Sequence, residues 1–481
     1  MPFSAPSAIL RGVNNDRSSQ DFDVAVVGGG SAGFAAARAA ASAGLRTALI
    51  EGAAEVGGLC ILRGCMPTKR LLYAAEVLHH ARQASQWGLR VPEAKFDFAQ
   101  VMARKDALIK EFAADRRRGL SEGGFQFIPA RARFLDAHTL ELRSGARLTA
   151  GAFIIATGST AAPCPVPSLE KLGYLTSDGA LTLARLPESL VVLGGGPLGT
   201  EFAQFFARFD VKVTLVQRDE HLLNHFDADA GAVLEEVFRQ EGLEVFTGAR
   251  LLEAQRQGNL KEVLFDHRGR QTRIAAEEIL FALGRVPNLA ALGLESAGIK
   301  TEAGRILTDR YLETSVPHIY AAGDCVGSRE VVHRAIQQAE VAVHNIAHPH
   351  QRRAMNDRLF VQVVFTEPQV ASVGLTEQAA QHSGIPYLAA SAPFTNSGKA
   401  IVMEATAGFV KLLAEPSRGE ILGACCVGPL GGELIHEIVA AMQGRLTVRE
   451  LADLPHYHPT LASLWTYPAV ELARQIKDGM A

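Results

Sequence analysis

Two cysteines five positions apart, Cys60 and Cys65, are the residues of this sequence best suited to redox chemistry. A straight helix would separate them by about 7.5 Å along its axis, while a disulfide needs Cα atoms within about 7 Å. For the two to pair, the chain must leave straight helical geometry, and Gly64 supplies that freedom. Pro67 suits the first turn of a helix, which places Cys65 just before a helix N-terminus, where a thiolate is stabilised. Two ordinary buried thiols are the alternative interpretation.

A glycine-rich turn typical of dinucleotide binding follows the apolar run 24–27, with Gly28, Gly30 and Gly33 spaced as G-x-G-x-x-G. In this pattern the first glycine permits a tight turn and the second lets the backbone approach a pyrophosphate. The third lets the following helix pack on the strand, and the phosphates lie at the helix N-terminus. The next apolar run ends at Glu51, where an acid would accept hydrogen bonds from a ribose.

The same pattern recurs after the run 190–193. Its glycines are Gly194, Gly196 and Gly199. Here the acid at the end of the next strand is replaced by Gln217, and Arg218 follows. An acid would favour the free 2′-hydroxyl of NAD, whereas an arginine can pair with the 2′-phosphate of NADP. The sequence therefore favours NADPH, with a solvated loop charge as the alternative interpretation of Arg218.

The elements that must position these residues belong to an α/β chain. The 481 residues are enough for two to four domains, in which short Val/Ile/Leu runs alternate with Ala-rich amphipathic stretches, as in βαβ units. From about residue 357 the pattern changes to that of a separate α+β domain. The net charge of −3 argues against a nucleic-acid partner, and no apolar run is long enough to span a membrane. Six cysteines are too few for a secreted disulfide scaffold, so we expect a cytoplasmic protein.

The segment around the cysteines, GGLCILRGCMPTK (57–69), is one of several motifs that share a recognisable order. The others are FIIATGS (153–159), FALGRVPN (281–288), TSVPHIYAAGD (314–324), FTEPQVASVGLTE (365–377) and HYHPTLAS (456–463). With them the sequence resembles the class I pyridine nucleotide–disulfide oxidoreductases, which include dihydrolipoamide dehydrogenase, glutathione reductase and mercuric reductase. The resemblance covers nearly the whole chain after residue 20.

The resemblance implies a homodimer of subunits with two Rossmann-like domains, which bind FAD and NADP(H) or NAD(H), and a C-terminal α+β dimerisation domain. The expected segments are a disordered N-terminal extension (1–20), an FAD domain (21–163 with 284–356), an NAD(P) domain (164–283) and a dimerisation domain (357–481). Further implied cofactor contacts are Gly58, Lys69, Ala156, Thr157, Gly158, Glu201, Gly284, Arg285, Gly323 and Asp324.

The resemblance also assigns the catalytic roles. Cys60 and Cys65 would form the redox disulfide, with Cys65 nearer the flavin and Cys60 exchanging with a small or protein-bound disulfide substrate. Lys69 and Glu201 would form an ion pair beside the flavin. His458 would be the acid–base group, supplied by the partner subunit, as suits an imidazole near neutral pH.

One position departs from the family pattern: Ser463 stands where most disulfide-reducing relatives have a glutamate that orients the histidine. Either catalysis is slower, another acid substitutes, or the substrate is not a simple dithiol–disulfide pair. Dihydrolipoamide dehydrogenase-like chemistry is our first expectation. A glutathione reductase-like or metal-ion reductase activity, or a flavin-binding complex subunit or redox sensor, is the alternative. The C-terminal QIKDGMA lacks the cysteine pair of mercuric reductases, which argues against mercury.

No metal site is predicted. Cys425 and Cys426 are adjacent in a strand-like run, so two packed thiols on opposite faces are expected rather than a soft-metal site. The histidines 344, 348 and 350 lie in a polar segment near a helix end, where a solvated surface is expected. His456 is expected to be structural or to support His458.

Overall fold

The computed structural model describes residues 20–327 and 329–476. By their contacts these residues form two compact units. The first comprises the described residues up to 58 with 114–160 and 286–355, and the second comprises 59–113, 161–285 and those from 356 onward. All but the last residue of the expected N-terminal extension, and the last five residues of the chain, lie outside the described residues. The division into three domains stays a prediction.

The first unit is built on a parallel sheet with β1 (Phe22–Val27) at its centre. On one side lie β2 (Thr47–Ile50) and then β3 (Gln126–Ile128), and on the other lie β6 (Arg147–Ile155) and then β18 (Ile319–Ala321). These strands consist largely of buried apolar residues, as expected of a parallel sheet covered on both faces.

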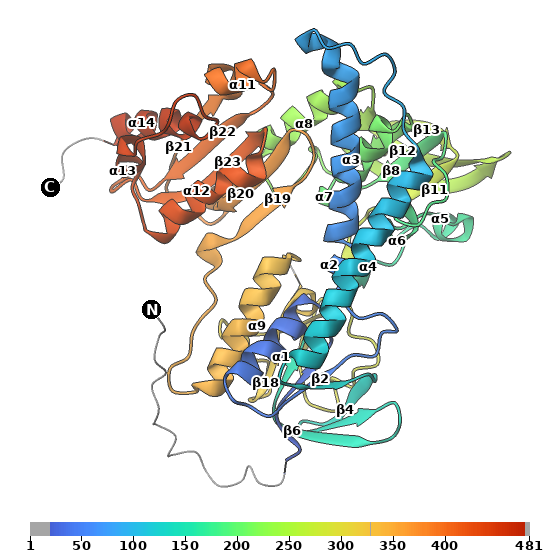
Figure 1. Ribbon diagram of the computed structural model, residues 1–481, viewed down its shortest axis with the longest axis vertical. Helices are drawn as coiled ribbons and strands as arrows, with labels where there is room; N and C mark the ends of the chain where they lie inside the picture. The colour runs from blue at the N-terminus through green and yellow to red at the C-terminus, as the bar shows by residue number, and fades with distance from the viewer. Residues whose placement is uncertain (1–19, 328, 477–481) are drawn as a thin grey trace. The chain divides into compact units, whose positions relative to one another are not determined.

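Alternate side chains of β1 enter two different cores, because successive residues of a strand point to opposite faces. Val24 and Val26 pack with α1 (Ser31–Ser42) and α9 (Val332–Ala347), which lie side by side (Figure 1). Ala25 and Val27 share the other core with residues of β4 (Ala132–Asp136) and β5 (Thr139–Leu142). The sheet is thus the middle layer of the unit.

The second unit contains a second parallel sheet of the same kind. Here β8 (Ser189–Leu193) lies between β9 (Lys212–Val216) and β14 (Glu278–Phe281), with β10 (Glu244–Phe246) beyond β9. The turn after β8 leads directly into α7 (Pro197–Arg208). A separate antiparallel meander consists of β11 (Ala249–Gln257), β12 (Leu260–His267) and β13 (Arg270–Ala276).

The same unit holds a five-stranded antiparallel sheet near the C-terminus. Its strands, in spatial order, are β19 (Val361–Val364), β20 (Gln369–Gly374), β23 (Ile421–Gly428), β22 (Phe409–Ala414) and β21 (Leu388–Pro393). The helices of this part include α12 (Gly431–Gln443), which contacts β20 and β23, α13 (Val448–Asp453) and α14 (Thr466–Gln475).

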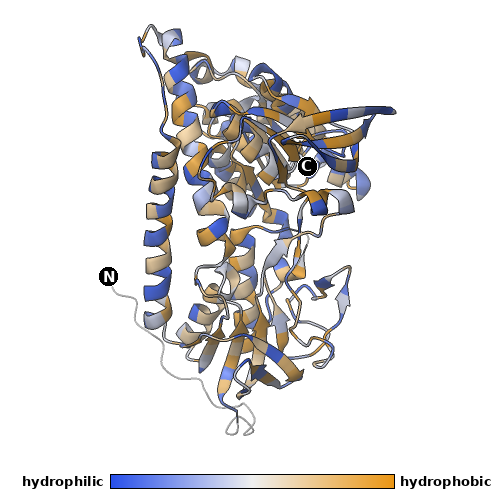
Figure 2. Ribbon diagram, turned by 90° about the vertical axis from the view of Figure 1, so that its right-hand side faces the viewer, coloured by the Kyte–Doolittle hydropathy of each residue, from blue (hydrophilic) through white to orange (hydrophobic). Residues whose placement is uncertain are grey.

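The helix that carries the redox cysteine motif belongs to this second unit. A short helix, α2 (Gly58–Arg63), precedes α3 (Cys65–Gln83), and α3 packs on α7 through a shared core. Leu71 and Ala75 of α3 meet the phenylalanines of α7 there, among them Phe202 and Phe206. Hydrophobic and hydrophilic residues alternate along the long helices in Figure 2, as expected of helices with one buried face.

The fold class expected from the sequence is confirmed: an α/β chain with two dinucleotide-binding sheets and a C-terminal α+β part. Among the described helices, none combines the length and the apolar character that crossing a bilayer requires.

Candidate active site

The two redox candidates lie on either side of a helix break. Cys60 lies in α2 and Cys65 opens α3, and Gly64 between them is non-helical, with φ −132° and ψ −115°. A Cβ on Gly64 would lie 3.0 Å from the carbonyl oxygen of Leu59 and 3.3 Å from the Cα of Cys60, so the turn is tightly packed. The sequence predicted that the helix begins just after Cys65. In the structure Cys65 is the first residue of α3, and Pro67 is the third.

Both thiols are free, and the two side chains are hydrogen-bonded to each other. The hydrogen bond from Cys60 lowers the pKa of Cys65 to about 7, assisted by the charge of Lys69 and opposed by burial. The same hydrogen bond, with burial, raises the pKa of Cys60 well above its usual range. The pair therefore ionises at Cys65 and keeps its proton on Cys60, which makes Cys65 the thiolate near neutral pH.

Lys69 lies one helical turn after Cys65 on α3, and its side chain contacts Glu201 and Phe365. Its Nζ donates to Oε1 and Oε2 of Glu201 on α7, at 2.9 and 2.8 Å, and Glu201 is almost completely buried. The backbone N–H of Phe365 donates to Glu201 Oε1 at 3.0 Å, and the Nζ of Lys69 lies 4.6 Å from the centre of the Phe365 ring. The cation is thus fixed in one place by a charge-assisted pair and an aromatic face.

The first glycine-rich turn has the geometry that close backbone contact requires. Gly28 has φ +108°, and a Cβ there would lie 2.3 Å from the carbonyl oxygen of Ala156. A Cβ on Gly33 would lie 1.7 Å from the carbonyl oxygen of Gly28, so α1 can pack on the strand only with glycine at this position. A Cβ on Gly30, the N-cap of α1, would meet no atom of the described residues within 4 Å, and none of their side chains caps the helix. Its N-terminal N–H groups are therefore available to phosphate oxygens.

The polar groups around this turn also fit a bound dinucleotide. Glu51 accepts hydrogen bonds from the backbone N–H groups of Gly29 and Ala53, both at 2.7 Å. The Oγ1 of Thr157 is buried without a hydrogen-bond partner among the described residues, as expected of a hydroxyl that bonds a cofactor. Ser159 donates to Asp324 at 2.6 Å and so orients that carboxylate. On these observations the first unit fits FAD.

The other expected cofactor contacts cluster at turns. A Cβ on Gly58 would lie 2.6 Å from the Cα of Gly30. The carbonyl of Gly158 accepts from the N–H of Asn288 at 2.9 Å, and the N–H of Gly323 donates to Gln338 at 2.8 Å.

In the second unit the expected contacts after β14 are likewise at a turn. The carbonyl of Gly284 accepts from the N–H of Ala162 at 3.0 Å. Arg285 opens the short strand β15 (Arg285–Pro287).

The second glycine-rich turn repeats the first almost distance for distance. Gly194 has φ +108° and a Cβ there would lie 2.4 Å from the carbonyl oxygen of Ala282. A Cβ on Gly199 would lie 1.8 Å from the carbonyl oxygen of Gly194, while one on Gly196 would meet nothing within 4 Å. Gln217 takes the position of the acid, and its Oε1 accepts the N–H of Gly195 at 3.0 Å.

Arg218 extends into solvent beside this turn. Its side chain is 81% exposed, and its Nε lies 3.7 Å from Asp219, a distance typical of a weak surface pair. The Nε2 of Gln217 donates to the same Asp219 at 3.0 Å. The arginine is therefore available to a ligand phosphate.

His456 and His458 are two residues apart in the sequence, but their side chains have different surroundings in the structure. His458 is exposed and makes no hydrogen bond to any described residue of its own chain. The hydroxyl of Ser463 donates to the carbonyl of Thr460 at 2.8 Å, so it serves its own turn. His456, in contrast, is held between the carbonyl of Leu454 and the carboxylate of Glu437, at 2.9 and 2.7 Å. Glu437 thus orients His456, which is a structural histidine.

The remaining candidates have structural contacts. Cys425 and Cys426 of β23 point into two different cores, and burial raises the pKa of both thiols. The Nε2 of His344 is hydrogen-bonded to the carbonyl oxygen of Gln351 at 2.9 Å, which fits a surface turn. Arg63 lies 3.6 Å from Asp178, with both side chains about half exposed.

Two polar contacts of the site were not predicted. The N–H group and ring of Phe365 both serve the Lys69–Glu201 pair, although the sequence indicated only that a domain begins near this residue. Ser159, which orients Asp324, is the last residue of the motif 153–159, of which only Ala156, Thr157 and Gly158 were assigned. In both cases the indication available in the sequence was the position of the residue at the edge of a recognised motif.

Comparison with known proteins gives matches along most of the chain. Residues 22–342 match the family described as pyridine nucleotide-disulphide oxidoreductase, and residues 360–468 match its dimerisation domain. A mercuric reductase from Streptomyces lividans is 36% identical over 462 residues, which cover 94% of this chain and 96% of that protein. A dihydrolipoyl dehydrogenase from Geobacillus stearothermophilus is 34% identical over 445 residues, which cover 91% and 93%.

Solved structures show the same relationship. LpdA from Mycobacterium tuberculosis superposes with a TM-score of 0.83 at 30% identity, covering 93% of this chain and 99% of that one. The HOCl-induced flavoprotein disulfide reductase RclA from Escherichia coli has a TM-score of 0.82 at 27% identity, with coverage of 93% and 99%. The chain therefore belongs to the pyridine nucleotide–disulphide oxidoreductase family, as an enzyme that uses FAD and NAD(P)H.

Proposed function

We propose that Cys60 and Cys65 are the redox-active pair of this enzyme and that it acts on a small dithiol or disulfide, as a dihydrolipoamide dehydrogenase does. The observation that carries the proposal is the geometry of the pair: Cys60 and Cys65 lie on either side of the helix break at Gly64, and their side chains are hydrogen-bonded to each other. The lowered pKa of Cys65 and the raised pKa of Cys60 support it. FAD supplies the two-electron chemistry that links NAD(P)H to such a pair. The low cysteine count supports a cytoplasmic site of action.

Lys69, Cys60 and His458 would then have separate roles in catalysis. Lys69, fixed by Glu201 and Phe365, would place a positive charge beside the flavin and beside the thiolate of Cys65. Cys60, the thiol that keeps its proton, would exchange with the substrate once that proton is removed. His458 would remove it, because an imidazole titrates near neutral pH.

A metal ion as electron acceptor is the second candidate. It is favoured by the histidine region, because His458 has no carboxylate partner among the described residues of its chain and Ser463 is bonded to Thr460 instead. Reduction of a metal ion held by two thiolates returns no proton to a leaving thiol, so it depends less on an oriented imidazole. A flavin-binding complex subunit or redox sensor would show no steady turnover with either class of acceptor.

The test begins with anaerobic titration of the FAD-loaded protein with NADPH and with NADH, followed by visible absorbance. A long-wavelength charge-transfer band is expected, from the Cys65 thiolate against oxidised flavin. Cys60→Ser retains a hydroxyl donor and is expected to show the band without reductant, whereas Cys65→Ser is expected to abolish it. Bleaching of the flavin with no band in the natural protein would contradict the assignment of the cysteines.

Steady-state assays then separate the substrates. Turnover of lipoamide or glutathione disulfide supports the first candidate, and NAD(P)H oxidation that depends on Hg²⁺ or Cu²⁺ supports the second. In the first case Ser463→Glu is expected to raise turnover, because a carboxylate would stabilise the imidazolium of His458. A neutral or harmful effect would count against that role.

We also propose that the active form is a homodimer. The match to the family's dimerisation domain supports this, as do exposed apolar side chains on α3 and in the C-terminal part, such as Tyr73, Val77, Val402 and Tyr457. His458 is exposed and has no hydrogen-bond partner among the described residues of its own chain, which fits action on the cysteines of a second subunit.

Subunit complementation tests the homodimer. Cys60→Ser and His458→Ala subunits, each inactive in disulfide exchange alone, are unfolded and refolded together with FAD. If sites are shared, heterodimers contain one fully natural site, and the random mixture is expected to regain about a quarter of the natural activity. A mixture that stays as inactive as its components would mean that His458 acts within its own chain or does not act.

A further inference from the structure

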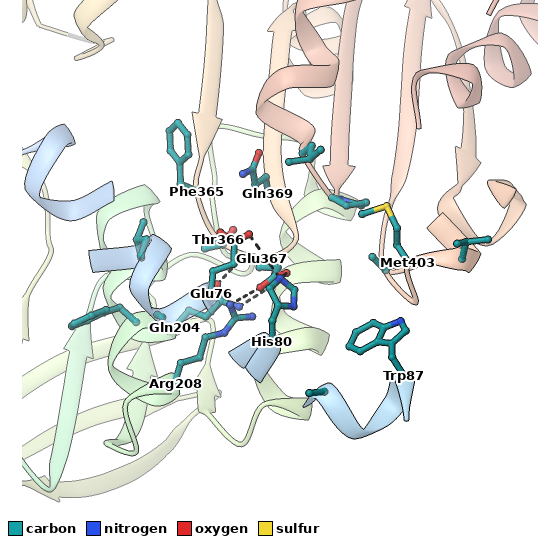
Figure 3. A pocket seen from close by; sticks show the side chains of 18 of the residues that line it. Glu76, His80, Trp87, Gln204, Arg208, Phe365, Thr366, Glu367, Gln369 and Met403 are labelled. Atoms are coloured by element: carbon teal, nitrogen blue, oxygen red, sulfur yellow. Dashed lines mark hydrogen bonds and ion pairs between the residues drawn. The ribbon is translucent and has the colours of Figure 1, made fainter. Parts of the chain in front are cut away.

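A cavity in the second unit contains three side chains that the redox chemistry does not use. The cavity has a volume of about 560 Å³ and lies between α3, α7 and the segment that joins β19 to β20. Glu76 and His80 enter it from α3, one helical turn apart, and Glu367 enters from the joining segment (Figure 3). We call these three residues the Glu-His-Glu cluster.

The spacing of the cluster suits a tetrahedral ion. The Nε2 of His80 lies 3.4 Å from Glu367 Oε1 and 3.8 Å from Glu76 Oε1, and one ligand atom of each residue lies within 4.8 Å of the other two. Two ligands bound to one zinc ion at roughly 2.0–2.1 Å lie about 3.4 Å apart, so the His80–Glu367 distance already fits. Glu76, whose side chain is 41% exposed, has room to complete the set.

Glu367 is held in place by other residues. Its carboxylate Oε2 accepts from Arg208 at 2.5 Å, which leaves Oε1 directed to His80. Its backbone is fixed by Gln204, which accepts the N–H of Glu367 at 2.8 Å and donates to its carbonyl at 2.7 Å. A positioned carboxylate of this kind is characteristic of metal ligands supported by a second layer of hydrogen bonds.

The charges around the cluster also favour the binding of a cation. Arg208 is shared between Glu367 and Glu241, and among the described residues Glu76 forms no ion pair other than the 3.8 Å contact with His80. With His80 neutral, these three carboxylates and one guanidinium leave two negative charges unbalanced. Burial and the nearby Glu367 raise the pKa of Glu76, in keeping with crowded carboxylates.

From this geometry we propose that the Glu-His-Glu cluster is a binding site for a divalent cation of the Zn²⁺ class, which joins α3 to the segment before β20. One imidazole and two carboxylates suit such a borderline ion, whereas Mg²⁺ and Ca²⁺ prefer oxygen alone and soft ions prefer thiolate. The fourth position of the ion would be open to water. None of the three residues takes part in the proposed redox chemistry.

The experiment uses FAD-loaded full-length protein in a Cys60→Ser/Cys65→Ser background, so that the redox thiols cannot bind the metal. After dialysis against a chelator, Zn²⁺ affinity is measured by competition with a chromophoric chelator. One Zn²⁺ per chain is expected. His80→Gln and Glu76→Gln are each expected to weaken binding by more than the roughly 10- to 100-fold that a supporting residue contributes.

Two histidine variants serve as matched controls. His79→Gln changes the neighbouring residue on α3, and His348→Gln changes the surface histidine group near residue 350, and both are expected to retain full affinity. Zinc K-edge absorption of the loaded protein is expected to show nitrogen and oxygen neighbours and no sulfur. Equal affinity in the parent and His80→Gln, or loss in His348→Gln instead, would overturn the proposal. Because NADPH oxidation is measured separately with natural cysteines, either result leaves the redox assignment independently testable.

Discussion

The two glycine-rich turns of this chain are the same structure built from different sequences, and they differ in one side chain that matters. Gly28 and Gly194 share a φ of +108°, and in both turns a Cβ at the third glycine would overlap the carbonyl oxygen of the first. The same backbone N–H, that of the second residue of the turn, is bonded by Glu51 in one unit and by Gln217 in the other.

That difference teaches which part of the motif builds the turn and which part selects the nucleotide. An acceptor oxygen at the strand end suffices to fix the turn, because the amide of Gln217 does so as well as the carboxylate of Glu51. The negative charge is therefore available for choosing the ligand: it favours a free ribose hydroxyl and repels a 2′-phosphate. The first turn keeps the charge, and the second replaces it with a neutral amide beside the exposed Arg218.

The largest expected effect comes from adding a methyl group where each helix packs on its strand. Gly33→Ala and Gly199→Ala would place a Cβ 1.7 and 1.8 Å from a carbonyl oxygen, so each turn must deform. We expect Gly33→Ala to be purified without flavin, and Gly199→Ala to keep its flavin but lose reduction by NADPH. Absorbance spectra and stopped-flow reduction measure both. Loss of flavin in both variants would show that the two turns are not independent.

A change of nucleotide preference is expected to be smaller. In Gln217→Glu/Arg218→Ala the second turn takes the charge of the first, and the ratio of kcat/KM for NADPH over NADH should fall by about 10- to 100-fold, or ~1.4–2.8 kcal/mol. Arg268→Ala, which removes an arginine on a hairpin turn of the same unit, controls for the loss of a positive charge elsewhere and should leave the ratio unchanged. A natural enzyme that already prefers NADH would contradict the role given to Arg218.

The reciprocal change in the first turn should have a more moderate effect. Glu51→Gln keeps one acceptor oxygen for Gly29 but loses the charge and the second bond, to Ala53. A hydrogen bond to a charged group contributes about 1.5–3 kcal/mol and one to a neutral amide about 0.5–1.5 kcal/mol. The difference of about 1–1.5 kcal/mol should make FAD dissociate roughly 10-fold more readily. Flavin fluorescence during dilution measures the release. Unchanged retention would mean that Glu51 only shapes the turn, as Gln217 does.

The smallest expected effect concerns the residue that follows the alanine whose carbonyl oxygen faces the first glycine of each turn. This residue is Thr157 in the first unit and Leu283 in the second. Because the buried hydroxyl of Thr157 has no protein partner among the described residues, Thr157→Val should leave the unfolding temperature of the flavin-free protein unchanged or slightly higher. FAD affinity should fall about 5-fold, the value of one ordinary hydrogen bond. A destabilised flavin-free protein with undiminished FAD affinity would show that the hydroxyl serves the fold.

Much of this architecture could be predicted because its signals are local. The glycine spacing and the apolar runs determined both turns, and the alternation of strand side chains placed Cys425 and Cys426 in separate cores. The sequence also indicated a break at Gly64, but it misplaced the start of α3 by one residue, because Pro67 fits the third helical position as well as the first.

What escaped prediction depends on residues that meet only in the folded chain. The backbone N–H group of Phe365 donates to Glu201, the ion-pair partner of Lys69. Any residue type could supply such a group, so the residue type did not indicate this contact. Likewise, the partner of His456 was not found because Glu437 lies 19 residues away on another element. Glu76 and His80 had a helical spacing that could have been noticed, but their third member, Glu367, is distant in sequence.

The carboxylate of Glu201 has a consequence for how the protein is made. It joins Lys69, 132 residues earlier, to the backbone of Phe365, 164 residues later. During synthesis, which proceeds from the N-terminus, the cation can find its acid early, but the third contact must wait until the C-terminal part leaves the ribosome. A nascent chain, or one truncated before that point, would therefore carry the lysine of the candidate active site paired but not yet fixed. The order of translation is in this way also the order in which the candidate active site becomes rigid.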